Sequence, residues 1–348
     1  MNTLFFRFYQ QHTPKVKLSQ QQLHALEEFK LKLKNGVYHF VDVPCLCGNK
    51  SGKLIAHRDR YGLPVHTHLC KLCGTMWTSP RMTEDSLSDF YNIDYRPIYV
   101  GTQIAKEDFF AEQIQHGRRI YKFVSSEMNN TQQPIVFDVG CGAGGALIPF
   151  AEASWSTFGC DLGGDFLERG RKSGLVLKQG DINVLKEHGL ASLVILSHVL
   201  EHFPDPLHSI QQISRSLTSD GYVYVELPGI FSIHETYGDL MRFLQNAHLY
   251  HFTLTTLTSL MSKVGFRLVK GNEEIYALFQ KDNTTMICSS SGEFQRISKY
   301  LYFIELVRII KHYRFVYYPY RLGLKMIRRI FGNDCVNGIK NRMAWPSE

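Results

Sequence analysis

The sequence predicts an α/β protein built around a parallel, doubly wound sheet, and three observations support this fold class. Residues 135–161 follow the order strand, glycine turn, helix, strand and acid. Residues 101–285 alternate short apolar runs with longer helix-favouring stretches. Residues 192–196 are apolar almost throughout, as expected of a strand covered on both faces. Alternation of this kind places helices on both faces of one sheet.

Size and composition indicate a globular protein with one extended central domain or two domains. The chain has 348 residues, 44% hydrophobic and 20% charged, which is ordinary for a soluble protein. The N-terminus lacks the apolar core of a signal peptide, and no run reaches the roughly 18 apolar residues of a membrane span. We therefore expect a cytoplasmic protein, in which eight cysteines indicate metal ligands and free thiols rather than disulfides.

The formal charge of +7 is concentrated in the C-terminal tail. Residues 295–348 hold eleven Lys and Arg against three acids, so the rest of the chain carries about −1. After a small polar linker, we expect 286–348 to form a basic, aromatic helical extension. Its composition fits either ordinary packing on the core or peripheral contact of 295–348 with an anionic membrane, at the inner face. No nucleic-acid-binding motif supports a third use of this charge.

The first hundred residues contain a predicted helix and a candidate metal site. Residues 18–34, within an N-terminal segment 1–40, have the apolar spacing of a helix. Residues 41–100 carry two cysteine pairs, each followed by glycine: Cys45, Cys47, Cys70 and Cys73. Such knuckles direct thiolates at one metal, so they predict a structural Zn²⁺ in a small zinc-ribbon-like domain. The first pair is C-x-C where C-x-x-C is usual, and the alternative ligands are His57, His66 and His68.

A helix capped by Thr83 follows the second knuckle. Beyond it lie Tyr91, Tyr95 and Arg96. These side chains either hold a sugar or phosphate near a cleft or simply pack.

The glycine turn opens the central domain, residues 101–285. Its glycines are Gly140, Gly142, Gly144 and Gly145. Glycine adopts backbone angles that other residues avoid, and it lets a ligand approach the main chain. Asp161 ends the next strand, where a carboxylate can accept both hydroxyls of an adenosine ribose. Together these features predict a mononucleotide-binding unit.

The remaining pattern predicts alternating helices and strands up to residue 280. The expected helices are 108–128, 146–153, 164–174, 206–217 and 257–264, and the later strands are 175–177, 192–196, 222–227, 265–269 and 275–280. The long connection 228–261 follows the fifth strand. Loops at this edge of a doubly wound sheet form the ligand pocket, so we expect this connection to cover an acceptor site.

Four motifs resemble the class I S-adenosylmethionine-dependent methyltransferases: DVGCGAG at 138–144, Asp161, GD at 180–181 and HVLEH at 198–202. The resemblance implies a seven-stranded Rossmann-like sheet and S-adenosylmethionine as methyl donor. It places the methionine part against Asp138 and the backbone of Gly140, Cys141 and Gly142, the ribose against Asp161, and the adenine against Asp181 and Ile182. Gly144, Leu162 and Ser197 complete the implied cofactor site.

A narrower resemblance concerns the acceptor. The cysteine pairs, DRYGL at 59–63 and FYNIDYR at 90–96 are similar to the zinc-containing methyltransferases of sugar and surface-polysaccharide pathways. The sugar C-methyltransferases of that group carry a Tyr-His-Glu-His-type segment, which corresponds here to 246–253. His248 matches, but Ala247 stands where the group has an acid. This departure favours methylation of a sugar hydroxyl, which needs only one general base.

Histidines are the candidate bases: His198, His202 and His248, with His251 as a fourth. Alignment supplies most of the rate of an in-line methyl transfer, and histidine suits removal of a proton near neutral pH. The H-x-x-x-H spacing at 198–202 also suits a catalytic metal, although the sequence shows no third ligand. The alternative is that HVLEH shapes the pocket floor without transferring protons.

These observations lead to one expectation and two rivals. We expect an S-adenosylmethionine-dependent methyltransferase acting on a sugar, nucleotide sugar or lipid-linked glycan in surface polysaccharide or related biosynthesis, with no nucleic-acid partner. The first rival is a C-methyltransferase of a keto-sugar, which requires a second acid or base near His248. The second is a zinc-bearing binding protein whose cofactor fold no longer catalyses.

Overall fold

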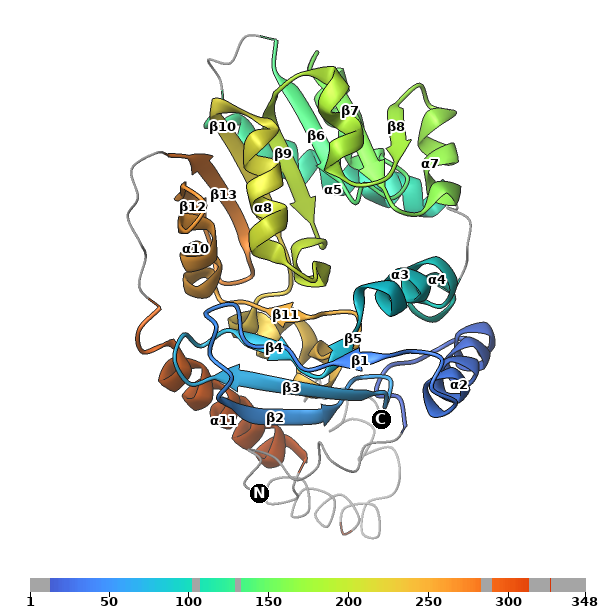
Figure 1. Ribbon diagram of the computed structural model, residues 1–348, viewed down its shortest axis with the longest axis vertical. Helices are drawn as coiled ribbons and strands as arrows, with labels where there is room; N and C mark the ends of the chain where they lie inside the picture. Colours follow the sequence, from blue (N-terminus) through green and yellow to red (C-terminus); the bar gives the residue numbers. More distant parts are fainter. Residues whose placement is uncertain (1–12, 102–106, 129–132, 283–289, 313–325, 327–348) are drawn as a thin grey trace.

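A seven-stranded sheet forms the centre of the protein in the computed structural model, which describes residues 13–101, 107–128, 133–282, 290–312 and 326 (Figure 1). The strand order is β12-β13-β10-β9-β6-β7-β8. The bounds are β6 (Ile135–Val139), β7 (Ser156–Asp161), β8 (Val176–Gln179), β9 (Ala191–Ser197), β10 (Leu217–Glu226), β12 (Phe266–Gly271) and β13 (Tyr276–Lys281). The predicted seven-stranded α/β sheet is confirmed.

Five of these strands are parallel, whereas the last two form an antiparallel hairpin at one edge. Strand β13 pairs antiparallel with both β10 and β12. The parallel arrangement expected for the whole sheet therefore ends at β10. The link 272–275 between β12 and β13 is too short for the crossover that parallel strands need, and it returns the chain directly.

Helices cover both faces of this sheet because successive side chains on a strand point to opposite sides. On one face, Val136 of β6 joins an apolar cluster with Ile120 of helix α5 (Glu107–Ser125). On the other face, Phe137 joins a second cluster with Ile210 of helix α8 (Pro206–Arg215). The remaining helices that cover the two faces are α6 (Ile148–Glu152), α7 (Gly164–Arg171) and α10 (Leu254–Ser262).

The helix after the glycine turn is shorter than the sequence suggests. In place of one helix over 146–153, the chain makes a 3₁₀ turn at Gly145–Leu147 and then α6. Helix α5 lies directly over this turn, because a Cβ on Gly117 would approach the Ala146 carbonyl oxygen to 2.3 Å. The close contact fixes the turn against α5 at the edge where ligands bind.

The N-terminal part forms a separate antiparallel sheet that is completed from far along the chain. Its order is β11-β4-β3-β2, with β2 (Gly52–Arg58), β3 (Pro64–Cys70), β4 (Met76–Thr78) and β11 (Tyr250–His251). Strands β1 (Phe40–Val41) and β5 (Arg81–Met82) make a second small pair. Around them stand the helices α2 (Gln20–Lys34), α3 (Glu84–Ile93) and α4 (Tyr95–Tyr99).

Strand β11 belongs to the long connection after β10, which the N-terminal sheet holds in place. Besides strand pairing, the backbone N–H groups of Thr78 and Arg60 donate to the carbonyls of Leu249 and Leu244, both at 2.9 Å. The buried Asp59 carboxylate accepts the Asn246 N–H at 2.8 Å. Between β10 and β11 the connection forms a 3₁₀ turn (Ile230–Ser232), a π-helical turn (Ile233–Tyr237) and helix α9 (Leu240–Phe243).

Helix α11 (Glu293–His312) packs beneath the N-terminal sheet (Figure 1). Its buried side chains Ile297, Leu301 and Ile304 join one apolar cluster with Ile55 of β2 and Leu69 of β3. The later part of the predicted basic extension lies outside the described residues, except Met326. Within the described part of the chain, no helix is long and apolar enough to cross a membrane.

Candidate active site

A cavity of about 450 Å³ lies between the carboxyl ends of the parallel strands and the helices α3 and α4. The sheet side contributes residues that end or follow β6, β7, β8 and β9: Val139, Gly140, Asp161, Leu162, Gly163, Gly180, Asp181, Ile182, His198 and Val199. The opposite wall comes from α3 and α4, and includes Tyr91, Tyr95 and Arg96. Ligands of open α/β sheets bind at this edge, and a cavity of this size suits a small-molecule ligand.

The glycine turn is fixed to the neighbouring strand by its own backbone. The N–H groups of Gly140 and Cys141 both donate to the Cys160 carbonyl, at 2.7 and 3.0 Å. Gly140 has φ of +73°, and a Cβ there would lie 2.5 Å from Val199 Cγ2. Only glycine therefore fits at this position, and the turn presents bare backbone to the cavity.

Asp161 lies at the tip of β7 and is held at both oxygens. Oδ2 accepts the Gly142 N–H at 2.9 Å, and Oδ1 accepts the Gly163 N–H at 2.8 Å. The Arg96 guanidinium of α4 donates to Oδ1 at 3.2 Å. Asp138 is buried below, where burial and the neighbouring Asp161 charge raise its pKa to about 8. The acid expected beside the glycine turn is therefore in contact with it.

The residues expected around the adenine lie at the far side of the same cavity. Asp181 precedes a 3₁₀ segment (Ile182–His188), and its Oδ1 accepts the Asn183 N–H at 2.9 Å. Asp181 and Ile182 line the cavity with Leu162. The other expected cofactor residues do not line the cavity: Asp138, Cys141, Gly142, Gly144 and Ser197.

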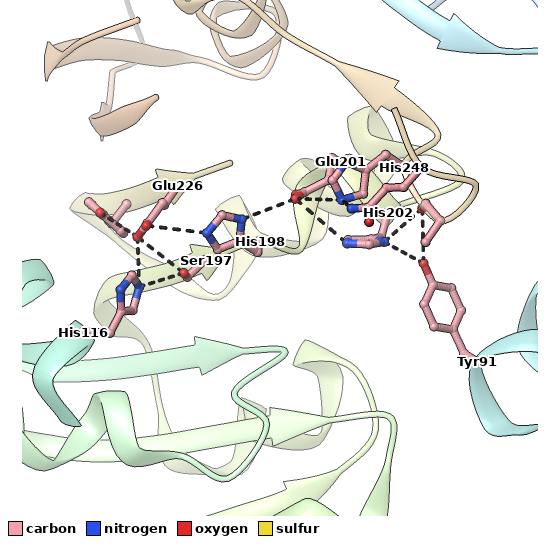
Figure 2. Close-up of polar contacts among 11 residues, drawn as sticks. Tyr91, His116, Ser197, His198, Glu201, His202, Glu226 and His248 are labelled. Atoms are coloured by element: carbon pink, nitrogen blue, oxygen red, sulfur yellow. Dashed lines mark hydrogen bonds and ion pairs between the residues drawn. The ribbon is translucent and has the colours of Figure 1, made fainter. Parts of the chain in front are cut away.

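Three histidines converge on one buried carboxylate, Glu201 (Figure 2). Glu201 Oε1 lies 3.7 Å from His198 Nδ1, 3.9 Å from His202 Nε2 and 3.7 Å from His248 Nε2. The Glu201 side chain is 1% exposed, and neither of its oxygens has a hydrogen-bond partner among the described residues. The structure thus brings together the three predicted catalytic histidines around an acid that the sequence analysis gave no role.

His202 is oriented by contacts at its other ring nitrogen. Its Nδ1 lies 2.9 Å from the Ala247 carbonyl and 2.8 Å from the Tyr91 hydroxyl. Since a carbonyl only accepts, Nδ1 carries the hydrogen and Nε2 has a free lone pair. Burial lowers the pKa of His202, so the imidazole is neutral at physiological pH. His202 also lines the cavity, while its unprotonated Nε2 is directed toward Glu201.

His248 and His251 occupy a more enclosed place. Burial, together with neighbouring His202, lowers the pKa of both histidines. The His248 ring lies edge-on to His202, with ring centroids 4.8 Å apart, and it contacts the Gln245 side chain. Neither His248 nor His251 lines the cavity. Glu201, His202 and His248 also offer ligand atoms within 4.8 Å of one another. This group leaves out His198, so it differs from the metal site that the 198–202 spacing suggests.

His198 differs from the other two because it sits between two carboxylates. Its Nε2 lies 3.6 Å from Glu226 Oε1, and its Nδ1 faces Glu201. Burial alone would lower the pKa of His198, but Glu201 and Glu226 outweigh it and raise the pKa to about 10. Its backbone has φ of +55°, a left-handed conformation uncommon outside glycine. These two carboxylates favour the imidazolium form of His198, whose side chain is 54% exposed.

Glu226 and His116 are site residues that the sequence analysis missed. Glu226 ends β10, and its Oε2 accepts from the Tyr224 hydroxyl and lies 3.0 Å from His116 Nε2 (Figure 2). Burial alone would raise the pKa of Glu226, but His116 and His198 outweigh it and lower the pKa to about 2. The sequence position of Glu226 was the available signal, because an acid at the carboxyl end of a parallel strand lies at the edge of the sheet where ligands bind. His116, in the middle of α5, carried no such signal.

The four cysteines of the predicted metal site lie together in the N-terminal part of the chain. The ligand sulfurs of Cys45, Cys47, Cys70 and Cys73 are all within 4.8 Å of one another. Cys45 Sγ is 3.5 Å from Cys73 Sγ, and Cys47 Sγ is 3.6 Å from Cys70 Sγ. The hydrogen bond from Cys45 lowers the pKa of Cys73, which favours the thiolate form of Cys73. None of His57, His66 and His68 joins this group.

Comparison with known proteins gives two matches in sequence. Residues 110–270 match the model of a family described as a methyltransferase domain. The C-methyltransferase NovU of Streptomyces niveus is 24% identical over 230 residues, which cover 63% of this chain and 51% of NovU. The chain thus spans about half the length of this curated relative.

Solved structures of methyltransferases show a distant similarity. Magnesium protoporphyrin IX methyltransferase from Synechocystis PCC 6803, with bound SAH, is 16% identical, covers 57% of this chain and 100% of its own, and has a TM-score of 0.40. A SAM dependent methyltransferase from Archaeoglobus fulgidus is 20% identical, covers 44% and 69% of the two chains, and has a TM-score of 0.36.

Proposed function

From the premise that residues 110–270 are an S-adenosylmethionine-dependent methyltransferase domain, we propose that the protein methylates a sugar or glycan acceptor. The observation that carries the proposal is the joint placement of Asp161, Asp181 and the neutral His202 around one cavity. The first two residues suit an adenosine, and the third suits removal of a proton from an acceptor. A nucleotide sugar or lipid-linked glycan in surface polysaccharide biosynthesis is the acceptor class that we favour.

The residues at the sheet edge fit the cofactor. Gly140 lines the cavity with its backbone, and only glycine fits there because a Cβ would collide with Val199. Asp161 offers carboxylate oxygens to a ribose once the Arg96 guanidinium moves aside, and Asp181 and Ile182 line the space for an adenine. S-adenosylmethionine supplies an electrophilic methyl group on a sulfonium. The protein's part is to hold the acceptor in line with that group.

The opposite end of the cavity suits an acceptor rich in hydroxyls. Helices α3 and α8 contribute polar side chains to its lining: Glu84, Ser88, Asn92, Ser209 and Gln212. The serine, asparagine and glutamine side chains can both donate and accept hydrogen bonds, and the Glu84 carboxylate accepts them, as the hydroxyls of a sugar require. The apolar side chains between them, including Leu87, Phe203 and Ile213, can pack on the carbon face of a sugar ring.

We assign proton removal to His202. Its free Nε2 faces Glu201, so a proton accepted there comes to lie between the imidazole and a buried carboxylate. The negative charge of Glu201 stabilises the imidazolium that forms. Tyr91 and the Ala247 carbonyl hold the ring in the required tautomer. His248 lies beside both His202 and Glu201 but does not line the cavity. The raised pKa of His198 makes it a poor base at neutral pH.

One observation favours a second candidate function, methylation of carbon rather than oxygen. The missing acid at Ala247 favours a hydroxyl acceptor, but Glu201 lies 3.7 Å from His248 Nε2 and supplies an acid from another part of the chain. Removing a proton from carbon needs a base together with a group that stabilises the resulting enolate. His202 and the His198 cation provide both, and the relative NovU is named a C-methyltransferase.

The four cysteines fit a structural Zn²⁺ within the protein. Four sulfurs within 4.8 Å of one another match a closed tetrahedral thiolate site with no open position. We assign the metal a role in holding the loops of the N-terminal sheet.

A product assay tests the proposal. Purified protein is incubated with S-adenosylmethionine and a panel of nucleotide-activated hydroxy-sugars and keto-sugars, and the products are analysed by mass spectrometry and NMR. Solvent-deuterium uptake at the carbon beside the carbonyl, with S-adenosylhomocysteine in place of the donor, separates carbon from oxygen methylation. Failure of calorimetry to detect binding of either cofactor form would refute the proposal.

The base assignment is tested with His202→Gln. We expect kcat to fall roughly 10²- to 10⁴-fold while the Kd for S-adenosylmethionine is unchanged, because His202 acts only on the acceptor proton. His24→Gln, at an exposed position on α2, serves as the control and should leave both values unchanged. A His202→Gln variant with normal kcat would exclude His202 as the base.

A further inference from the structure

The cluster around Glu201 holds more ligand atoms than the removal of one proton requires. Glu201 Oε1, His202 Nε2 and His248 Nε2 lie within 4.8 Å of one another. The carboxylate is buried, and neither of its oxygens has a hydrogen-bond partner among the described residues. The two histidine nitrogens stay 3.9 and 3.7 Å from it, beyond hydrogen-bond distance. Because a buried charge is costly unless it is closely paired or coordinates a metal, this carboxylate calls for a further partner.

The backbone holds the three ligand atoms in place. Glu201 and His202 belong to a 3₁₀ turn (Leu200–His202) that follows β9, whereas His248 precedes β11. The Leu249 N–H donates to the Glu201 carbonyl at 2.8 Å, and this bond joins the two segments beside their side chains. A ligand set carried by fixed backbone is preorganised for a small ion.

The spacing and the donor types suit a transition-metal ion. Tetrahedral Zn²⁺ has bonds of about 2.0 to 2.1 Å to nitrogen and oxygen, which keeps its ligand atoms about 3.4 Å apart. The separations of Glu201 from the two histidines are a few tenths of an ångström longer, so small rotations bring the atoms to coordination distance. Two imidazoles with one carboxylate also form the protein ligand set of open zinc sites. His202 lines the cavity, which gives an ion its route of entry.

The surroundings of the cluster favour a bound ion that exchanges. The Ala247 carbonyl accepts from His202 Nδ1 at 2.9 Å, as is usual behind a metal-bound histidine, and this leaves Nε2 free to coordinate. The Gln245 side chain contacts His248 Nε2 and has to turn away, but its amide oxygen has no hydrogen-bond partner among the described residues. His198 Nδ1 also faces Glu201, 3.7 Å from Oε1, and competes with a metal for this carboxylate. We therefore expect reversible binding.

We propose that Glu201, His202 and His248 form a reversible site for Zn²⁺ or a similar divalent transition-metal ion, and that the ion inhibits methyl transfer. An ion at His202 Nε2 occupies the lone pair that would otherwise accept the acceptor's proton. The site is separate from the four cysteines, which hold the structural metal. Its inhibitory effect rests on the assignment of His202 as the base, whereas metal binding does not.

Cobalt absorption of the full chain tests the site without an activity measurement. The protein is loaded with Zn²⁺, dialysed against metal-free buffer so that only the cysteine knuckles keep their ion, and titrated with Co²⁺. We expect one added Co²⁺ per chain, with visible d–d bands and without the near-ultraviolet charge-transfer band of a cobalt thiolate. Such a spectrum identifies nitrogen and oxygen ligands.

Glu201→Gln and His248→Gln should each weaken Co²⁺ binding at least about a hundredfold, because changing a group behind a metal ligand already costs about 10- to 100-fold. Two variants are used so that the test survives if one of them does not fold. His251→Gln is the matched control, since His251 is a neighbouring buried histidine outside the ligand group. It should bind Co²⁺ like the unmodified chain. In the product assay, added Zn²⁺ should lower the rate of methyl transfer as the second site fills.

The site would be refuted by absence of a second equivalent of metal, or by cobalt absorption that always includes the thiolate band. Unchanged binding in both Glu201→Gln and His248→Gln, or an equal loss in His251→Gln, would also refute it. Full methyl-transfer activity with the second site filled would overturn the inhibitory role. The absorption is recorded without methyl donor or acceptor, so an inactive protein that binds Co²⁺ as expected would count against the proposed function and support the metal site.

Discussion

His198 shows how one residue's surroundings can reverse the role that its type suggests. Histidine after a parallel strand is a good candidate base, but Glu201 and Glu226 raise the pKa of this one to about 10. The left-handed backbone at His198 is consistent with a functional position, because strained residues persist where surrounding contacts hold them. Its charge faces the cavity, where it can stabilise an oxyanion that develops during a reaction.

The raised pKa of His198 predicts a pH-dependent stability. A histidine with pKa near 6.5 in the unfolded chain and about 10 in the folded protein stabilises the fold fully below pH 6.5. This contribution is lost as the pH rises toward 10. The difference in unfolding free energy between the protein and His198→Asn should therefore shrink over that range, measured by urea denaturation. Asparagine tolerates the left-handed backbone.

His24→Gln provides the comparison for this measurement, since His24 lies on the surface of α2. Its difference curve should be flat over the same pH range. A His198→Asn curve that is equally flat, or that rises with pH, would contradict the assignment of a cationic His198.

The cysteine knuckles illustrate how a bound metal can hold the loops of one structural element together. Two strands of the N-terminal sheet are short, since β4 has three residues and β11 has two. A metal joining the loops before β2 and after β3 would supply cohesion that such strands lack. We expect one zinc per chain by elemental analysis, and Cys73→Ser should remove it and lower the unfolding free energy by more than about 4 kcal/mol.

Cys160→Ala is the control for this prediction, because Cys160 is a buried thiol outside the knuckles. This variant can be less stable through its smaller side chain, yet it should retain a full equivalent of zinc. Full zinc content in Cys73→Ser would contradict the four-thiolate site, and zinc-free protein of normal stability would contradict its structural role.

The cofactor side of the site was more predictable than the acceptor side for a physical reason. The glycine turn, Asp161 and Asp181 follow consecutive strands of one sheet, so local pattern is enough to place them at one edge. The acceptor side depends on contacts between distant segments, such as Tyr91 with His202 and Glu201 with His248. These pairs arise only from tertiary packing, so local sequence pattern does not predict which of these residues come into contact.

The cavity joins the two parts of the whole molecule, since α3 and α4 close the sheet edge. Binding of S-adenosylhomocysteine should therefore slow amide hydrogen exchange in helix 84–93 as well as in the glycine turn. At a ligand concentration of about 100 times Kd, the expected stabilisation is about 2.7 kcal/mol. Hydrogen exchange followed by mass spectrometry measures both regions.

Helix 293–309 provides an internal reference, because it contributes nothing to the cavity lining. Its exchange should not change on binding. Protection confined to the sheet would show that helices α3 and α4 do not close on the ligand.

Strand β11 has a consequence for how the protein is made. The N-terminal sheet pairs Trp77 with Tyr250, so its last strand leaves the ribosome long after the others. At 5–20 residues per second, this delay lasts roughly ten to thirty seconds. Until then the edge of β4 is unpaired and open to other chains. The knuckles, complete by residue 73, can take up metal during that interval and hold β2 and β3 together while translation continues.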